Sequence, residues 1–295
     1  MKHYQFCPVC KQDQFIDFLQ AKDFTVSGEY FVIKACKACG FRFTQNIPDQ
    51  QESGRYYASE DYVSHSNTNK TLFFKVYQWV RNYALKSKQR TIQRYIHQPG
   101  ELLDIGCGTG HFLAEMKKNG WTVTGLEPSE KARKIALETN GISAINPDYL
   151  YGFSENKFQV ISMWHVLEHV HTLEEYIQQI FKILDDSGIF IIAVPNSNSY
   201  DAKYYREYWA AYDVPRHLYH FVPETMKLLA EKKGFKMVGI HPMWFDAFYV
   251  SMLSEQCKNK SKIRGLIYGF LSNIHALTNK CQTSSLIYVL QKKRN

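Results

Sequence analysis

One short stretch of this chain constrains its fold more than any other. An apolar run, residues 101–105, leads directly into Gly106-Cys-Gly-Thr-Gly110, and an amphipathic segment follows. Glycine lets a backbone turn sharply and approach a ligand closely, so this pattern predicts a strand, a ligand-binding loop and a helix. The loop differs from the dinucleotide-binding G-x-G-x-x-G motif, because His111 stands where the third glycine would be.

The chain after this loop alternates between strand and helix patterns. We expect parallel strands at residues 101–105, 121–126, 142–145, 158–164 and 189–194. A further antiparallel pair is expected at residues 235–240 and 285–290. Ser129 is a predicted helix N-cap, and Thr172 begins a predicted capping box with Glu175. The alternation predicts an α/β fold, a Rossmann-like, seven-stranded, mostly parallel sheet with helices on both faces.

Glu127 follows the second predicted strand, 21 residues after Gly106. A carboxylate at that strand end accepts hydrogen bonds from ribose hydroxyls. The glycine loop, the strand before it and this acid together indicate an adenosine-containing ligand.

These motifs resemble those of class I S-adenosylmethionine-dependent methyltransferases. Residues 102–110 are similar to the first motif of the family and residues 125–129 to its second. Residues 163–170 are similar to the strand-four motif of the branch that contains the ubiquinone-pathway O-methyltransferases. The resemblance implies S-adenosylmethionine as cofactor and a methyl transfer by in-line displacement. The cofactor-binding residues that we carry over are Asp104, Gly106, Cys107, Gly108, Gly110, Glu127, Pro128, Asp148, Trp164 and His165.

Four of the seven cysteines form two C-x-x-C pairs, Cys7 with Cys10 and Cys36 with Cys39. Two facing pairs bring four thiolates into a tetrahedron, which is typical of a closed, structural Zn²⁺ site. Iron at the same cysteines, or a redox pair, is the alternative. A segment of this size cannot bury a sufficient core alone, so metal would add folding free energy. We expect residues 1–50 to form a zinc-ribbon-like module, similar to the N-terminus of nucleotide-sugar C-methyltransferases.

The net charge of +8 is unevenly distributed, because two basic segments contain no acidic residue. One lies between Asp61 and Glu101, and the other follows Glu255. Residues 51–98 are expected to form a basic helical linker or lid, with a helix over residues 70–97. Basic segments suit anionic partners such as a membrane surface, although a solvated cationic face and a plain connecting helix are the simpler interpretations.

Residues 99–295 are expected to form the S-adenosylmethionine-binding domain, with a helical insertion over residues 243–283. The insertion contains an amphipathic stripe, and four basic residues precede or begin it. The stripe consists of Ile263, Leu266, Ile267, Phe270, Leu271 and Ile274, and the basic residues are Lys258, Lys260, Lys262 and Arg264. This pattern suits an interfacial helix, although packing against the domain or a second subunit is the commoner use.

Histidines after the predicted strands are candidates for a general base. His217 and His220 follow the fifth strand, where parallel sheets bind substrates, and Arg216 and Asp213 stand beside them. Such a cluster suits a base and an anion clamp. Packing and hydrogen bonding under a lid are the simpler interpretation.

His165 is a third candidate for the base, and it begins the sequence H-x-x-E-H, which ends at His169. That spacing is an inverted zinc-protease motif, but its place behind a nucleotide-binding half argues against a hydrolase. In ubiquinone-type enzymes, the corresponding Glu-x-x-Glu-His positions can hold a divalent ion. Here His165 replaces the first Glu, so a metal at Glu168 and His169 stays an open alternative to simple support of the cofactor.

Our leading interpretation is methyl transfer to a small-molecule, sugar/glycan-linked or lipid-linked acceptor, with a histidine base. The alternatives are an rRNA or tRNA methyltransferase and a non-catalytic cofactor-binding protein. Nucleic acid is less favoured, because the basic segments contain no RNA-binding motif. Residues 1–10 have no apolar stretch of the signal-peptide kind, and no apolar run reaches 18 residues. We therefore expect a cytoplasmic chain, membrane-peripheral if its basic segments bind lipid.

Overall fold

The large sheet of the protein has seven strands in the order β10-β11-β8-β7-β4-β5-β6. The structure is a computed structural model that describes residues 1–49, 52–57 and 72–293. The strands are β4 (Glu101–Ile105), β5 (Thr122–Leu126), β6 (Ala144–Ile145), β7 (Phe158–Trp164), β8 (Leu184–Pro195), β10 (Phe235–Pro242) and β11 (Ser285–Lys292). The five strands from β8 to β6 are parallel, and β11 and β10 add an antiparallel pair at one edge. The predicted fold is confirmed.

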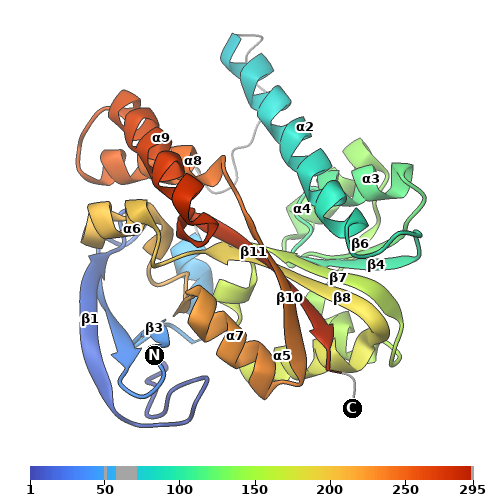
Figure 1. Ribbon diagram of the computed structural model, residues 1–295, viewed down its shortest axis with the longest axis horizontal. Coiled ribbons are helices and arrows are strands. Elements are labelled where there is room, and N and C mark those ends of the chain that lie inside the picture. The colour runs from blue at the N-terminus through green and yellow to red at the C-terminus, as the bar shows by residue number, and fades with distance from the viewer. Residues whose placement is uncertain (50–51, 58–71, 294–295) are drawn as a thin grey trace.

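Helices cover both faces of this sheet (Figure 1). The helices are α2 (Leu72–Gln93), α3 (His111–Lys118), α4 (Glu130–Asn140), α5 (Leu173–Ile183), α6 (Tyr200–Tyr205), α7 (Pro223–Lys232), α8 (Asp246–Cys257) and α9 (Lys262–Thr278). Successive strand residues point to opposite faces. Leu102 and Val160 pack with residues of α2, α3 and α4. Leu103 and Ile161 pack with residues of α5 and α7 on the other face.

Short 3-10 helices form several of the connections. They are η1 (Glu52–Tyr57), η2 (Pro147–Gly152), η3 (Leu167–His169), η4 (Arg206–Tyr208), η5 (Ala210–Tyr212) and η6 (Lys280–Gln282). Helices α8 and α9 lie between β10 and β11, in the predicted insertion. The predicted helix over residues 70–97 is shorter, since α2 ends at Gln93, and the part of it before Leu72 lies outside the described residues.

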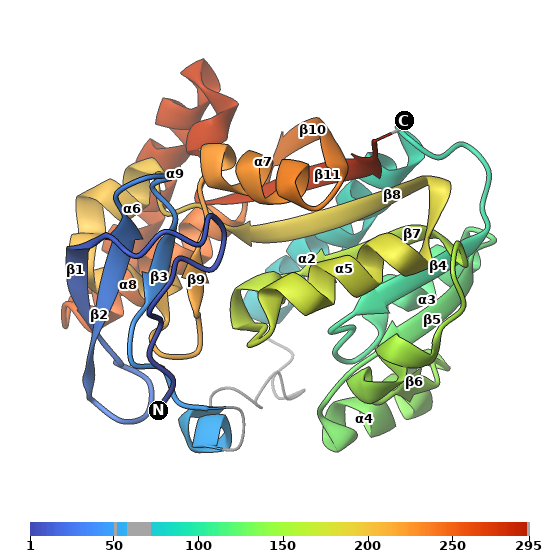
Figure 2. The same ribbon diagram turned by 90° about the horizontal axis from the view of Figure 1, so that it is seen from below.

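The small sheet contains three N-terminal strands and one strand from far along the chain. Its order is β1 (Phe15–Lys22), β2 (Tyr30–Cys36), β3 (Arg42–Thr44) and β9 (Tyr219–His220). Figure 2 shows it beside the large sheet. The rings of Tyr4, Phe41 and Phe43 join the core that contains Tyr219 and Phe221. The division into residues 1–50, 51–98 and 99–295 stays a prediction, and these contacts dock the first segment on the last.

The two predicted helix caps differ in outcome. The Ser129 side chain accepts a hydrogen bond from the Ala132 amide at 3.2 Å, as predicted. The capping box at Thr172 is wrong, because the Thr172 side chain makes no cap hydrogen bond. Its backbone, with φ −114° and ψ 60°, departs from the extended conformation that an N-cap residue usually adopts.

Candidate active site

The glycine loop between β4 and α3 adopts the conformation that its sequence requires. Gly106, Gly108 and Gly110 have positive φ angles of 73°, 54° and 78°. A Cβ atom at Gly106 would lie 2.4 Å from Cγ2 of Val166, whereas no atom lies within 4 Å of a Cβ at Gly108. The loop is therefore closed on its sheet side and open at Gly108, where a ligand can approach the backbone.

Alanine substitutions should separate these two glycines. We expect Gly106→Ala to lower the free energy of unfolding by about 3 kcal/mol, because a left-handed alanine costs about 1–2 kcal/mol and an overpacked contact about 1–3 kcal/mol. Gly108→Ala should cost only about 1 kcal/mol, from the backbone alone. Urea unfolding of both variants measures the difference. Equal losses of unfolding free energy would contradict the conclusion that the loop is closed at Gly106 and open at Gly108.

Glu127 closes the loop from the end of β5. Its Oε2 accepts a hydrogen bond from the Gly108 amide and its Oε1 one from the Ser129 amide, both at 2.9 Å. The Glu127 side chain is buried. Because a carboxylate oxygen has more than one acceptor position, both oxygens retain capacity for ligand hydroxyls. The arrangement has the chemistry of a ribose site beside a glycine loop.

Asp104 and Lys88 bring opposite charges to the same site. Burial raises the pKa of Asp104 to about 7, although a 2.6 Å hydrogen bond from Ser162 Oγ and the charge of Lys88 act against it. Burial likewise lowers the pKa of Lys88, against the attraction of Asp104 and Asp246. The Lys88 Nζ lies 4.2 Å from the ring centroid of Trp164. Sequence reasoning missed Lys88, because a lysine on a basic helix resembles a solvent-exposed one.

Trp164 ends β7 and forms an apolar wall of the site. Its ring packs edge-on against Phe112 of α3, with centroids 5.4 Å apart. Its Nε1 is buried and, within the described residues, has no hydrogen-bond partner. An unpartnered indole N–H at the end of β7 is the kind of group that a bound ligand satisfies. The residues of this site thus fit an adenosine-containing amino-acid cofactor.

Three other predicted cofactor residues are Cys107, Pro128 and Asp148, and their surroundings differ. The Cys107 side chain is buried against Gly125, whose Cβ would lie 2.7 Å from the Cys107 Sγ. The carbonyl of Pro128 accepts a hydrogen bond from Arg133. Asp148 is exposed in the first turn of η2, and its backbone amide donates to Asn146 Oδ1.

His165 follows β7 with a left-handed φ of 57° and lies between two carboxylates. Its Nε2 is 3.1 Å from Asp246 Oδ2, and its Nδ1 is 3.5 Å from Glu168 Oε1. Burial alone would lower the pKa of His165, but the hydrogen bond to Asp246 and the adjacent Glu168 outweigh it and raise the pKa to about 10. His165 is therefore an imidazolium at neutral pH. Asp246 was not foreseen from the sequence.

Glu168, His169 and His217 form a second cluster beside His165. One ligand atom of each lies within 4.8 Å of the others. The Nδ1 of His217 donates to Ala211 O at 2.9 Å, which leaves its Nε2 as an acceptor when the ring is neutral, whereas the Nδ1 of His169 lies 3.1 Å from both Arg216 O and the Tyr57 hydroxyl. Two imidazoles and a carboxylate could hold a soft divalent ion, and they could equally handle a proton.

His220 and Arg216 are occupied by structural contacts. Thr44 Oγ1 donates its only proton to His217 O, so His220 Nε2 must donate to Thr44 Oγ1 at 2.9 Å. Arg216 is buried and bonds Asp213, Asp23 and the Tyr56 carbonyl. An anion clamp by Arg216, considered from the sequence, does not fit these contacts.

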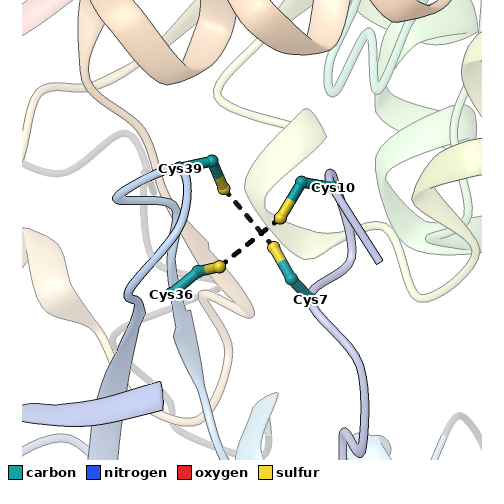
Figure 3. Close-up of side chains that lie close together, drawn as sticks. All are labelled: Cys7, Cys10, Cys36 and Cys39. Atoms are coloured by element: carbon teal, nitrogen blue, oxygen red, sulfur yellow. Dashed lines mark hydrogen bonds between the residues drawn. The ribbon is translucent and has the colours of Figure 1, made fainter. Parts of the chain in front are cut away.

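The four paired cysteines meet at the end of the small sheet (Figure 3). The Sγ atoms of Cys7 and Cys39 are 3.6 Å apart, and those of Cys10 and Cys36 are 3.4 Å apart, without a disulfide. Four sulfurs around Zn²⁺ at about 2.3 Å would be separated by about 3.8 Å. The cluster therefore fits a tetrahedral Zn²⁺ ion with little adjustment.

Comparisons with known proteins identify a methyltransferase domain in this chain. A family model described as "Methyltransferase domain" matches residues 78–240. The ubiquinone biosynthesis O-methyltransferase of Pelagibacter ubique is 28% identical over 122 residues, which cover 40% of this chain and 49% of that protein. The Rickettsia canadensis protein of the same name is 22% identical, over 64% of this chain and 75% of its own length. The chain thus spans about half the length of the first of these curated relatives.

Two solved structures share the fold. A SAM-dependent methyltransferase from Archaeoglobus fulgidus has a TM-score of 0.50 and 20% identity, covering 75% of this chain and all of that one. The Burkholderia thailandensis 1,6-didemethyltoxoflavin-N1-methyltransferase has a TM-score of 0.53 and 15% identity, covering 93% of this chain and all of that one. With a family match over more than half of its length, the chain belongs to the methyltransferase-domain family, within the class I S-adenosylmethionine-dependent methyltransferases.

Proposed function

We propose that the protein transfers a methyl group from S-adenosylmethionine to a small-molecule, sugar/glycan-linked or lipid-linked acceptor. One observation carries the proposal: the Glu127 carboxylate holds the open Gly108 loop at the end of the strands, in a chain of the methyltransferase-domain family. A relative named for ubiquinone biosynthesis supports a small-molecule acceptor.

Each charged residue of the site has a role in holding the cofactor. The Glu127 oxygens would accept hydrogen bonds from the ribose hydroxyls of the cofactor. Asp104 and Lys88 lie close enough to perturb each other's pKa, and their opposite charges suit the ammonium and carboxylate of the amino-acid part. Trp164 and Phe112 exclude water from the reacting centre, which strengthens electrostatic interactions there.

The bound cofactor supplies an activated methyl group on a sulfonium. The protein then needs to align the acceptor and remove its proton as the new bond to carbon forms. We propose His217 as this base. Its Nδ1–H is fixed by Ala211 O, and its Nε2 lies 4.0 Å from Glu168 Oε1 and 3.9 Å from Asp213 Oδ2. These two carboxylates would stabilise the imidazolium that forms.

The other two histidine candidates suit this role less well. His165 already carries a proton between Asp246 and Glu168, so it can orient groups and balance charge but cannot accept a proton. His220 is buried, and its Nε2 is used by Thr44. Burial, with the nearby charge of Arg42, also keeps the pKa of His220 well below its usual range, so the ring is neutral.

We further propose that Cys7, Cys10, Cys36 and Cys39 bind a structural Zn²⁺ ion. The sulfur spacing and the closed arrangement of the four side chains support it.

Calorimetric titration with S-adenosylhomocysteine tests the cofactor site. We expect binding by the wild type and a loss of about 10–100-fold for Glu127→Ala, because hydrogen bonds to a charged group contribute about 1.5–3 kcal/mol. The control is Glu130→Ala, which removes a carboxylate from the first turn of α4 without touching the loop. Absence of binding by folded wild type would refute the proposed activity.

Transfer from methyl-tritiated S-adenosylmethionine into a fractionated bacterial extract tests the acceptor class. We expect label in the small-molecule, glycan or lipid fraction. Label in the RNA fraction would favour the rRNA or tRNA alternative. Cofactor binding without label in any fraction would favour a non-catalytic binding protein.

A further inference from the structure

Helix α9 packs through its smallest residues and leaves its largest ones outside. Gly265, Gly269, Ser272 and Ala276 are buried on one side of the helix. A Cβ at Gly265 would lie 2.4 Å from the Cα of Met252, and one at Gly269 would lie 2.7 Å from the Cα of Phe248. The backbones of α8 and α9 are therefore in contact. This close packing fixes the rotation of α9 about its axis.

The opposite side of α9 carries a continuous row of exposed apolar side chains, which we name the α9 stripe. Its members are Ile263, Leu266, Ile267, Phe270, Ile274 and Leu277, each 44–70% exposed. Their spacing of three and four residues places them on one face along the whole helix. Figures 1 and 2 both show α9 at the periphery of the molecule. A contiguous exposed apolar surface of this kind marks an interaction site.

Exposed lysines flank the α9 stripe at both ends. Lys260 and Lys262 lie at the start of the helix, and Lys280 follows its end. No acidic residue follows Glu255 in the sequence, and Glu255 itself is buried, 3.6 Å from Arg264. The chain segment that carries the stripe is therefore cationic. It complements an anionic partner.

Charge distinguishes the two simplest occupants. A second copy of the chain, docked about a two-fold axis, would place lysines of one copy against lysines of the other. An anionic lipid surface instead offers phosphates to the lysines and acyl chains to the apolar side chains. In the described part of the chain, no helix is long and apolar enough to cross a bilayer.

We propose that α9 lies in the headgroup layer of an anionic bilayer, with the α9 stripe inserted and the three lysines on lipid phosphates. Helix α9 packs on α8, and α8 is connected directly to the active site. Helix α8 begins at Asp246, which is the partner of His165. The proposal does not depend on the reaction that the site catalyses.

Flotation of the full chain with lipid vesicles tests the apolar contacts. We expect binding to vesicles of phosphatidylcholine with phosphatidylglycerol and little binding to phosphatidylcholine alone. Ile267→Ser and Phe270→Ser should each lower partitioning about tenfold, because a large apolar side chain contributes at least about 1.4 kcal/mol on burial. The control is Leu137→Ser on α4, which removes an equally exposed apolar side chain elsewhere.

Removal of charge tests the lysines. The double variant Lys260→Gln/Lys262→Gln should bind anionic vesicles about 25-fold more weakly, since each lysine contributes about fivefold. Thermal unfolding of all variants, which should match wild type, separates lost binding from lost folding. No flotation with anionic vesicles, or unchanged flotation of the serine variants, would overturn the proposal. So would a wild-type dimer in light scattering that Phe270→Ser converts to a monomer, because the stripe would then be a subunit interface.

Discussion

Replacing Cys36 by serine is expected to unfold the small sheet and to lower the stability of the whole chain. Cys36 ends β2, and its side chain is almost fully buried in a core that also contains Phe41, Tyr219 and Phe221. Structural Zn²⁺ in small domains contributes about 10–16 kcal/mol of apparent binding free energy. A folded domain has only about 5–15 kcal/mol in total, so loss of one ligand should leave the sheet without a stable fold.

Zinc content and thermal unfolding measure this effect together. Wild type should carry one zinc per chain and should unfold at a lower temperature after treatment with a strong chelator. The Cys36→Ser variant should lack the metal from the start. Cys281→Ser is the matched control, because Cys281 lies outside the cluster. Two results would contradict a structural zinc site. One is a folded wild type that carries iron; the other is a folded wild type without metal whose thermal stability Cys36→Ser leaves unchanged.

The effect should reach the active site, because the small sheet holds the loop that carries His217. Strand β3 pairs with β9, which begins at Tyr219. Thr44 binds the backbone of the two residues just before this position: its amide donates to Leu218 O, and its Oγ1 donates to His217 O. The buried Arg216–Asp23 pair, 3.0 Å long, joins the same two segments. The zinc site therefore supports the position of the proposed base.

The parts of the fold that depend on local pattern could be predicted from the sequence. The strands around the glycine loop have short-range periodicity, and β7 coincides with the predicted residues 158–164. The pairing of β9 with β3 could not be predicted, because β9 is two residues long and its partner lies more than 170 residues away. A helix pattern likewise shows only that Lys88 lies on a helix, whereas its position over Trp164 depends on tertiary packing.

The histidine candidates show the same limit at the site itself. Sequence position suggests His217 and His220 first and His165 as a third candidate, since all three follow strand ends. Only tertiary contacts distinguish them, through Asp246 at His165 and Thr44 at His220. The Asp246 contact joins residues 81 positions apart, so no local motif reveals it.

Replacing His217 by alanine is expected to lower kcat about 1000-fold, within the range of about 10²–10⁴-fold that general-base catalysis contributes. The physical reason is that Nε2 of His217 is held as a proton acceptor next to Glu168 and Asp213. Binding of S-adenosylhomocysteine should stay within about twofold of wild type, because uniform ligand binding does not depend on the base. Tritium transfer into the labelled extract fraction measures kcat, and calorimetry measures binding.

Two further readouts separate a proton acceptor from a structural residue or a metal ligand. Added imidazole should restore part of the activity of His217→Ala, because a small base can occupy the vacated space, whereas it should not help a variant that is merely misfolded. His220→Gln is the matched control, since the glutamine Nε2 takes the place of the histidine Nε2 and preserves the bond to Thr44 Oγ1, and its kcat should change less than tenfold. The opposite outcome is that wild type carries a second metal, that His217→Ala loses it, and that imidazole restores no activity. In that case His217 binds the metal together with Glu168 and His169, and the general-base role is wrong.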